Sequence, residues 1–395
     1  MNILTFIQES DKNTKDVIKL VRRKGTVSRV DLASEMDIPK PTMTRIINKL
    51  IKNQILRESG LAESTGGRRP VLLEVNKDCA YSFGIDLGRK EVSVALINIH
   101  GDLVSLRNKV TSEQDTIGSL VSFIESATKD ILSEQDVSAS KLLGVGVGMP
   151  GPLNKMSEEA SPHDFYGAEN LPLRTMLEDA LSLPVTIDND ANVALLAEKW
   201  FGKASGLQQV IYIYSDVGVG CGILMNGEIY RGMYGEAGEI GHSIIDVHGD
   251  RCECGKYGCL ETFTSIKAIA LRAEKKRKAA GNHVASKPAH FSQVIDDLNE
   301  GEPIARETAE EVAQYLGIAV VNVIQSFDPE LVIIGGQFGQ SHPVVVEKVS
   351  EVVRRNTHKK NTYKAEITTS ELQNSIVLGG AALVINHAFL HKQTM

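Results

Sequence analysis

Apolar residues recur at helical spacing three times within the first 53 residues of the chain. The pattern predicts helices over residues 14–24, 28–36 and 42–53. Gly25 ends the first helix, and the proline-containing segment 37–41 ends the second. The expected apolar positions are Val17, Leu20 and Val21, then Val30, Leu32, Ala33 and Met36, then Ile46, Ile47, Leu50 and Ile51. Two helices joined by a short turn, as in the second and third, are the pattern of a helix-turn-helix.

The third predicted helix carries polar side chains on the side away from its apolar stripe. In a helix-turn-helix the second of the paired helices lies in the major groove of DNA. Arg pairs with guanine through two N–H groups and Asn pairs with adenine, so Arg45 and Asn48 are the expected base readers. Lys40 and Lys49 are expected at phosphates. The candidate DNA contacts of this helix are Lys40, Thr42, Thr44, Arg45 and Asn48. A three-helix packing module with a solvated charged face would show the same pattern.

Two short predicted strands, residues 54–58 and 70–75, follow the third helix and enclose a loop. Strand, loop and strand after a helix-turn-helix indicate a wing. The loop ends in two glycines followed by Arg68 and Arg69, a flexible arm whose guanidinium groups suit phosphates or a narrow minor groove. Residues 1–75 are therefore predicted to form a winged helix-turn-helix domain, although an ordinary basic linker would have the same loop composition.

The distribution of charge changes at the same place in the chain. Residues 1–75 hold 14 Lys and Arg against 9 Asp and Glu, whereas the remaining residues hold 29 against 41. A basic head on an acidic body favours a nucleic-acid-binding module attached to a domain that avoids nucleic acid. A surplus of this size also arises by chance.

From residue 80 onward strands alternate with helices. Residues 81–99 predict two strands joined by a tight turn at 87–90, and a similar opening recurs at 209–229. In the second opening, Asn226-Gly227 is a strong hairpin signal. Each opening is followed by further strands and then helices. This plan predicts an α/β body of two related lobes, residues 80–208 and 209–395, with a cleft between them.

The strongest chemical signal is a His and three Cys close together in sequence. The chain has five cysteines, an odd count that argues against a disulfide framework. His242, Cys252, Cys254 and Cys259 complete the ligand set of a tetrahedral zinc ion and leave no position for water, so the site is expected to be structural. His248 is a competing nitrogen ligand, and free cysteines in a loop are the alternative.

A second polar cluster, residues 188–192, follows an apolar strand at 183–187 and precedes a helix at 193–200. Its sequence is Asp-Asn-Asp-Ala-Asn. Carboxylates and amides at a strand end both accept from and donate to the hydroxyl groups of a sugar. The alternative is a cluster that caps the following helix.

With these motifs the chain resembles the ROK family (repressors, open reading frames, kinases), in its DNA-binding branch of xylose, N-acetylglucosamine and Mlc-type regulators. The resemblance covers almost the whole chain. Its motifs are residues 146–152, the Asn-Asp-Ala-Asn tetrad 189–192, the Gly-Glu-Ala-Gly-Glu-Ile-Gly-His run 235–242, the cysteine run ending at Glu261, and residues 328–336. It implies an actin/hexokinase-like two-lobe ATPase fold, whose C-terminal helix returns to the first lobe.

The resemblance also implies which residues hold a sugar. In family kinases the sugar is bound by the residues that match Asn189, Asp190, Glu239, His242 and Glu261. The residue matching Asp190 is the general base that takes the proton from the attacked hydroxyl. His242 is then expected to act twice, with one ring nitrogen on zinc and the other side toward the sugar, which couples metal to ligand geometry.

The nucleotide side departs from the family pattern. The first phosphate loop of the kinases reads Asp-x-Gly-Gly-Thr, whereas residues 86–90 end in Gly-Arg-Lys. The second resembles Gly-Thr-Gly-x-Gly-x-Gly, but residues 216–222 begin Asp-Val-Gly, and Asp216 places a carboxylate where phosphate would approach. We therefore expect no kinase activity, with Asp190 as a vestigial base. The alternative is that Arg89 or Lys90 contacts phosphate instead.

These observations predict a sugar-responsive transcriptional regulator, which we expect to be a repressor of carbohydrate uptake and metabolism genes. Its expected partners are palindromic operator DNA, a sugar or sugar-derivative effector, a structural Zn²⁺ ion and further copies of itself, as a homodimer or homotetramer. The N-terminus has no signal-peptide pattern and no apolar run approaches the roughly 20 residues that span a bilayer, so a cytoplasmic protein without membrane insertion is expected. The alternatives are a sugar kinase with a DNA-binding head and a sensor sequestered by a membrane sugar transporter.

Overall fold

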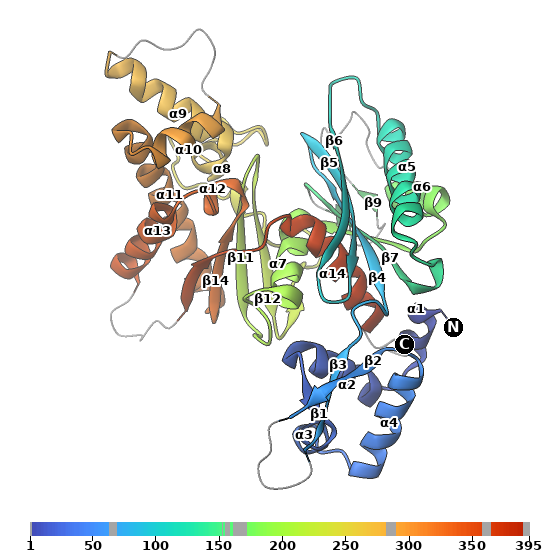
Figure 1. The fold of residues 1–395 in the computed structure, drawn as a ribbon. Helices are drawn as coiled ribbons and strands as arrows, with labels where there is room; N and C mark the ends of the chain where they lie inside the picture. The colour runs from blue at the N-terminus through green and yellow to red at the C-terminus, as the bar shows by residue number, and fades with distance from the viewer. Residues whose placement is uncertain are drawn as a thin grey trace. The chain divides into compact units, whose positions relative to one another are not determined.

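The computed structural model divides the chain into two compact units built from strands and helices (Figure 1). It describes residues 2–62, 69–151, 153–154, 159–160, 172–281, 290–357 and 365–389. The first unit consists of Met1–Val147, Arg174–Ile187 and Gly380–Met395, and the second of Gly148–Leu173 and Asp188–Gly379. The units do not follow the order of the sequence, because the chain passes from one to the other several times.

The head of the first unit is a small helical domain with a three-stranded sheet. Its helices are α1 (Ile3–Glu9), α2 (Lys12–Lys24), α3 (Arg29–Glu35) and α4 (Lys40–Lys52). Its strands are β1 (Val27–Ser28), β2 (Leu56–Leu61) and β3 (Val71–Val75), in the order β1-β3-β2. The three predicted helices and both wing strands are confirmed. Helix α1 and strand β1 are short elements that the periodicity of the sequence does not reveal.

Two details of the helix-turn-helix differ from the prediction. Helix α4 begins at Lys40, before the predicted start, because Pro41 lies in its first turn, where the missing N–H has no intrahelical partner to lose. Val30, one of the apolar positions expected in the second helix, is 52% exposed. It precedes Leu32 by two positions, which puts the two side chains on opposite sides of α3.

The body of the first unit is built on a five-stranded sheet in the order β10-β7-β4-β5-β6. The strands are β4 (Tyr81–Leu87), β5 (Glu91–Asn98), β6 (Leu103–Val110), β7 (Leu142–Met149) and β10 (Val185–Asn189). The accompanying helices are η1 (Ala139–Lys141), α5 (Ile117–Gln135), α6 (Leu173–Leu181) and part of α14 (Ser375–Phe389). The predicted strand pair over residues 81–99 is confirmed as β4 and β5. Every residue of β7 is buried, which is expected of a strand covered on both faces.

The second unit contains another five-stranded sheet, in the order β13-β12-β11-β14-β15. Its strands are β11 (Val210–Ser215), β12 (Val219–Met225), β13 (Glu228–Ile229), β14 (Leu331–Gly335) and β15 (Glu366–Thr369). The predicted hairpin at Asn226-Gly227 is confirmed, with φ angles of 52° and 75° that match the two left-handed residues of a type I′ turn.

Helices cover both faces of this second sheet (Figure 1). Helix α7 (Asp190–Phe201) lies on one face, where its apolar side chains pack against β11, β12 and β14. The opposite face is covered by α9 (Ile266–Ala279), α10 (Phe291–Asn299), α11 (Pro303–Phe327) and α13 (Pro343–Asn356). The remaining short elements are β8 (Leu153–Asn154), β9 (Glu159–Ala160), η2 (Ile240–His242), α8 (Glu261–Thr264) and α12 (Gly336–Gly339). Among the described residues, no helix has the length and apolar character needed to cross a membrane.

Candidate functional site

Strand β12 is where the segments with the predicted sugar residues meet. Its glycines allow α7 to approach very closely on one side, because a Cβ atom at Gly222 would lie 2.5 Å from the carbonyl oxygen of Ala191. A Cβ atom at Gly220 would lie 3.1 Å from Cβ of Ala191 and 3.8 Å from Oδ1 of Asp190. These contacts fix the start of α7, and with it Asp190, beside the beginning of β12.

The other side of β12 holds the loop that carries Glu239 and His242. A Cβ atom at Gly238 would lie 1.9 Å from the carbonyl oxygen of Cys221, and one at Gly241 would lie 2.1 Å from that of Val219. The loop therefore reaches the strand only because both positions are glycine. The two glycines place the 3₁₀-helical turn η2, and thus both candidate side chains, against the strand.

Glu261 reaches the same strand from the start of α8. Its Oε2 accepts a hydrogen bond of 3.2 Å from the backbone N–H of Val219. Residues 218–221 are therefore contacted by all three segments that carry predicted sugar residues. These segments are the start of α7 with Asn189 and Asp190, the loop with Glu239 and His242, and the start of α8 with Glu261. The geometry brings together residues from three separate parts of the sequence, and their role in binding stays a prediction.

Asn189 is the residue that caps α7. Its Oδ1 accepts from the backbone N–H of Ala191 at 2.9 Å, and its Nδ2 donates to the carbonyl oxygen of Gly151 at 3.2 Å. The capping alternative considered from the sequence therefore applies to this member of the cluster. A sugar would meet an amide whose orientation is already fixed by both of these bonds.

The carboxylate of Asp188, next to Asn189, is buried and bound by four donors. Its Oδ2 accepts from Nε and Nη2 of Arg231, at 2.9 and 2.5 Å. Its Oδ1 accepts from Nδ2 of Asn192 at 2.9 Å and from the backbone N–H of Asn189 at 2.8 Å. We call the ion pair the Asp188–Arg231 clamp. It ties the start of α7 to the loop before Glu239, and sequence reasoning missed it, although an Arg just ahead of the 235–242 motif was a usable signal.

The acidic character of this region affects Glu239 directly. Burial raises the pKa of its carboxyl group, and the negative charges of Glu261 and Glu236 act in the same direction. His242 opposes the shift. The shift favours the protonated form of the carboxyl group, which can donate a hydrogen bond to a hydroxyl group as well as accept one.

The four predicted metal ligands form one cluster. The ligand atoms of His242, Cys252, Cys254 and Cys259 all lie within 4.8 Å of one another. Nδ1 of His242 is 3.6 Å from Sγ of Cys252, and the sulfurs of Cys254 and Cys259 are also 3.6 Å apart. Zn–S bonds of about 2.3 Å at tetrahedral angles would separate the ligand sulfurs by about 3.8 Å, so the group fits zinc. Within the described part of the chain, His248 does not belong to this cluster.

Two glycines shape the loop that holds the cysteines. Gly255 and Gly258 have φ angles of 89° and 70°, and a Cβ atom at Gly258 would lie 1.5 Å from the carbonyl oxygen of Asp246. Burial raises the pKa of the Cys259 thiol to about 12, and the neighbouring thiols add to the shift. A divalent cation would reverse this by binding the thiolate. Cys252 also contacts the candidate sugar site, since its Sγ is 4.0 Å from Oε1 of Glu261.

The residues predicted to lie on the nucleotide side differ in how exposed they are. The carboxylate of Asp216 is buried and accepts from the backbone N–H of Val217 at 2.8 Å and from Nε2 and the backbone N–H of Gln337 at 3.1 and 3.2 Å. The protein's own donors therefore occupy this carboxylate. In the first unit, Arg89 and Lys90 are exposed.

The candidate DNA contacts lie mainly on the surface of the head. Lys40, Thr44, Arg45 and Asn48 are exposed on α4, opposite its buried stripe of Met43, Ile46, Ile47 and Leu50. Thr42 is half-buried, and the Thr44 hydroxyl donates to the carbonyl oxygen of Lys40 at 2.8 Å. In the wing, Arg69 is exposed, whereas Arg68 lies outside the described residues.

Comparison with known proteins assigns the family. Residues 82–387 match the model of the ROK family. The chain belongs to the ROK family. Among its relatives, the ROK protein named xylose repressor from Caldicellulosiruptor bescii is 33% identical over 94% of both chains. A solved ROK family transcriptional regulator, a homologue of the Escherichia coli MLC protein, superposes with a TM-score of 0.79 and 26% identity over 96% of both chains.

ROK kinases match a smaller part of the chain. A ROK family glucokinase from Streptomyces griseus, solved with glucose and AMPPNP, has a TM-score of 0.69 and 24% identity, and covers 78% of this chain but 100% of its own. The ROK model begins at residue 82, so the head lies outside it. The matches to the two regulators are too extensive to omit the head. The predicted fold, a winged helix-turn-helix followed by an actin/hexokinase-like two-lobe α/β domain, is confirmed.

Proposed function

We propose that this ROK protein is a transcriptional regulator, a repressor of carbohydrate uptake and metabolism genes, whose operator affinity is set by a sugar. The observation that carries the proposal is that its matches to a protein named xylose repressor and to a solved transcriptional regulator extend through the head, whereas the match to a ROK kinase covers only 78% of the chain. Such a protein acts in the cytoplasm, where its operator lies. In this proposal residues 1–75 bind DNA. Residues 80–208 and 209–395 form the two lobes, except that α7 belongs to the second unit and the end of α14 to the first.

The head would place α4 in the major groove of the operator. The exposed polar face of this helix carries a guanidinium and an amide at positions where a recognition helix reads bases. Arg68 and Arg69 of the wing would contact the adjacent backbone or minor groove. Two heads in a homodimer, or pairs of heads in a homotetramer, would recognise a palindromic operator, because half-sites mirror the symmetry of the protein.

Replacing Arg45 by alanine is expected to weaken operator binding by about 10- to 100-fold and to relax the base preference at one position of each half-site, because one bidentate contact is worth about 1–3 kcal/mol. Fluorescence anisotropy of a labelled operator duplex, selected from a random library, measures the loss. Lys129→Ala is the control, since that lysine is exposed on α5, outside the head. Equal losses on operator and random DNA would assign Arg45 to the phosphates instead.

The second unit would bind the effector through Asn189, Asp190, Glu239, His242 and Glu261, supported by a structural Zn²⁺ ion. The fit of the His/Cys cluster to tetrahedral geometry supports the metal. When bound, zinc would fix the loop that joins His242 to Glu261. The chain's own residues would do the recognition, with carboxylates and an amide pairing with hydroxyl groups.

The Asp188–Arg231 clamp supplies a test of this site. Arg231→Met is expected to weaken sugar binding by about 10-fold or more, because the clamp sets the spacing between Asp190 and Glu239 and loss of a supporting hydrogen bond typically has this effect. Isothermal titration calorimetry measures the change. The matched control is Arg306→Met, which removes a surface pair with Glu310 and should leave the affinity unchanged. If Arg231→Met binds sugar with wild-type affinity, the Asp188–Arg231 clamp does not position the sugar residues.

A kinase is the second candidate function, and the presence of Asp190 at the start of α7 favours it. We do not expect turnover, because Asp216 and Val217 replace the residues of the family's second phosphate loop and Asp216 is held by Gln337. Sugar-dependent ATP hydrolysis that disappears in Asp190→Asn would establish the kinase.

Calorimetric titration of the zinc-loaded protein tests the proposed function. The panel contains D-xylose, D-glucose, N-acetylglucosamine, their phosphates and ATP-Mg. We expect one sugar or sugar derivative to bind and ATP-Mg to give no heat of binding. Tight binding of ATP-Mg would overturn the sensor in favour of the kinase, and no binding by any sugar would remove the effector site.

A further inference from the structure

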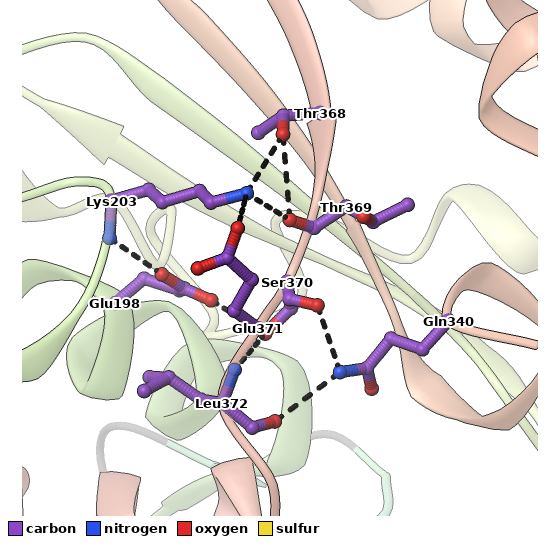
Figure 2. Close-up of polar contacts among 8 residues, drawn as sticks. All are labelled: Glu198, Lys203, Gln340, Thr368, Thr369, Ser370, Glu371 and Leu372. Carbon is purple, nitrogen blue, oxygen red and sulfur yellow. Dashed lines mark hydrogen bonds and ion pairs between the residues drawn. The ribbon is translucent and has the colours of Figure 1, made fainter. Parts of the chain in front are cut away.

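Helix α7 begins at the candidate sugar site, and a second polar cluster lies at its far end. Figure 2 shows this second cluster. Asn189 and Asp190 stand at its start, and Glu198 lies in its last two turns. Glu198 is completely buried. Its Oε1 accepts a 2.6 Å hydrogen bond from the Ser370 hydroxyl, and its Oε2 accepts one of 2.8 Å from the backbone N–H of Lys203.

Two further side chains, those of Lys203 and Gln340, hold residues 368–372, which we call the linker segment. Nζ of Lys203 donates to Oγ1 of Thr368 at 3.0 Å and to the carbonyl oxygen of Thr369 at 2.9 Å, and it pairs with Glu371 at 2.9 Å. From another side, Nε2 of Gln340 donates to the carbonyl oxygens of Ser370 and Leu372, at 3.0 and 3.3 Å. Figure 2 shows that these bonds and this ion pair reach each residue of the linker segment, from Thr368 to Leu372.

The bond between Glu198 and Ser370 is costly to break. A hydrogen bond to an ionised group is about twice as strong as a neutral one. A carboxylate without any exposed surface that lost this donor would be left with part of its charge uncompensated. These hydrogen bonds therefore hold the end of α7 against the linker segment.

The linker segment leads directly into α14, which passes from the second unit to the first between Gly379 and Gly380. In the second unit, a Cβ atom at Gly379 would lie 1.9 Å from the carbonyl oxygen of Val193 in α7. In the first unit, a Cβ atom at Gly380 would lie 2.5 Å from the carbonyl oxygen of Gly146 in β7. Adjacent residues of one helix thus pack against different units, and two consecutive glycines are a position where a helix bends easily.

The other end of α14 contacts the head. Phe389 is buried, and Nζ of Lys19 on α2 lies 5.8 Å from the centroid of its ring. The head also contacts the body of the first unit through Nε2 of His100, which is 3.0 Å from the carbonyl oxygen of Val75. Helix α14 therefore begins at the linker segment and ends against a helix of the predicted DNA-binding domain.

We propose that Glu198 is a positioning residue that transmits the sugar signal: it locks α7 to the linker segment, so that a shift of α7 on sugar binding displaces α14 and thereby the head. The inference rests on the proposed function of the protein and adds the route by which its sugar site regulates DNA binding. Glu198 touches neither sugar nor DNA. Its contribution is to the coupling between the two ligands, which is a property separate from either affinity.

The test is a measurement of that coupling. Operator affinity is determined by fluorescence anisotropy without sugar and at saturating D-xylose, or at saturation with whichever panel sugar the wild-type protein binds. The ratio of the two dissociation constants is the coupling factor, typically about 5- to 150-fold in allosteric proteins. In Glu198→Gln and in Ser370→Ala we expect this factor to fall to below about 2-fold. The sugar affinity of the free protein and the operator affinity without sugar should stay within about 2-fold of wild type.

The variants and controls separate this inference from a merely structural role. Ser370→Ala removes a single hydroxyl group and keeps the test decisive if Glu198→Gln fails to fold, and Lys203→Met loosens the linker segment from its other side. Ser326→Ala is the matched control, because its exposed hydroxyl group donates within α11, to the carbonyl oxygen of Asn322 at 2.8 Å. A wild-type coupling factor in folded Ser370→Ala and Lys203→Met overturns the inference. If sugar does not change the operator affinity of the wild-type protein, the proposed function is overturned instead.

Discussion

Replacing Cys259 by serine is expected to abolish zinc binding and, with it, sugar binding. Cys259 has no exposed surface, and its sulfur is 3.6 Å from that of Cys254. A serine hydroxyl is a poor zinc ligand because it stays protonated at neutral pH. The three remaining ligands would then lose the tetrahedral closure that makes a structural zinc site tight.

The loss should reach the sugar site through short stretches of chain. Cys259 is followed two residues later by Glu261, and His242 belongs to both sets of candidate ligands. The backbone around Cys259 also bonds to the segment after His242, since the N–H of Leu260 donates to the carbonyl oxygen of Ser243 at 2.9 Å. Without metal, the loop would lose the constraint that places Glu261 and His242 together.

Elemental analysis of dialysed protein measures the zinc, and calorimetry measures the sugar. Cys79→Ala is the control, because Cys79 is buried in the first unit and takes no part in the cluster. It should retain both zinc and sugar. A Cys259→Ser protein that binds sugar with wild-type affinity would show that the metal does not order the sugar site.

Gly222→Val is expected to lower the free energy of unfolding by about 3 kcal/mol and to weaken sugar binding in the protein that still folds. Even a single Cβ atom here would lie 2.5 Å from the carbonyl oxygen of Ala191 and 3.0 Å from Cβ of Leu195. Overpacking of this kind costs about 1–3 kcal/mol, with the larger values for bulkier side chains. Since Ala191 follows Asp190, displacement of α7 would also move the candidate sugar residues.

Urea denaturation followed by circular dichroism measures the stability. The control is Gly118→Ala in the first turn of α5, where an added Cβ atom would lie 3.8 Å from Oγ1 of Thr116, the nearest described atom outside the local backbone. It should be neutral or slightly stabilising, because alanine has the higher helix propensity. Wild-type stability in Gly222→Val would mean that α7 does not pack on β12 as described.

The same contacts change the interpretation of the glycine-rich segment 216–222. From sequence, its alternating glycines resemble a phosphate loop. In the fold, Gly220 and Gly222 are explained by the close approach of α7 to β12. These two glycines are required for packing whether or not nucleotide binds, so their presence is no argument for an ATP site.

Local patterns predicted what local physics determines. The helix-turn-helix, the hairpin at Asn226-Gly227 and the four-residue metal cluster all come from residues close in sequence, and the structure forms each of them. The boundaries of the helices moved by a few residues, as at Lys40, where a proline inside the first turn resembled a break in the sequence.

Contacts between distant parts of the chain were beyond such reasoning. Asp188 and Arg231 are 43 residues apart, and Glu198 and Ser370 are 172 residues apart. No periodicity links the members of either pair. A glutamate within an apolar helix is expected to be exposed to solvent unless a buried partner for it is known. Both pairs depend on how sheets and helices pack, which the sequence pattern does not specify.

Operator binding in the presence and absence of sugar tests the central claim most directly. A labelled palindromic duplex, selected from a random library by the purified zinc-loaded protein, is titrated by fluorescence anisotropy alone and with each sugar of the calorimetric panel. The account predicts specific binding that one sugar weakens by about 5-fold or more. The same operator affinity with every sugar, or no preference for any duplex over random DNA, would contradict it.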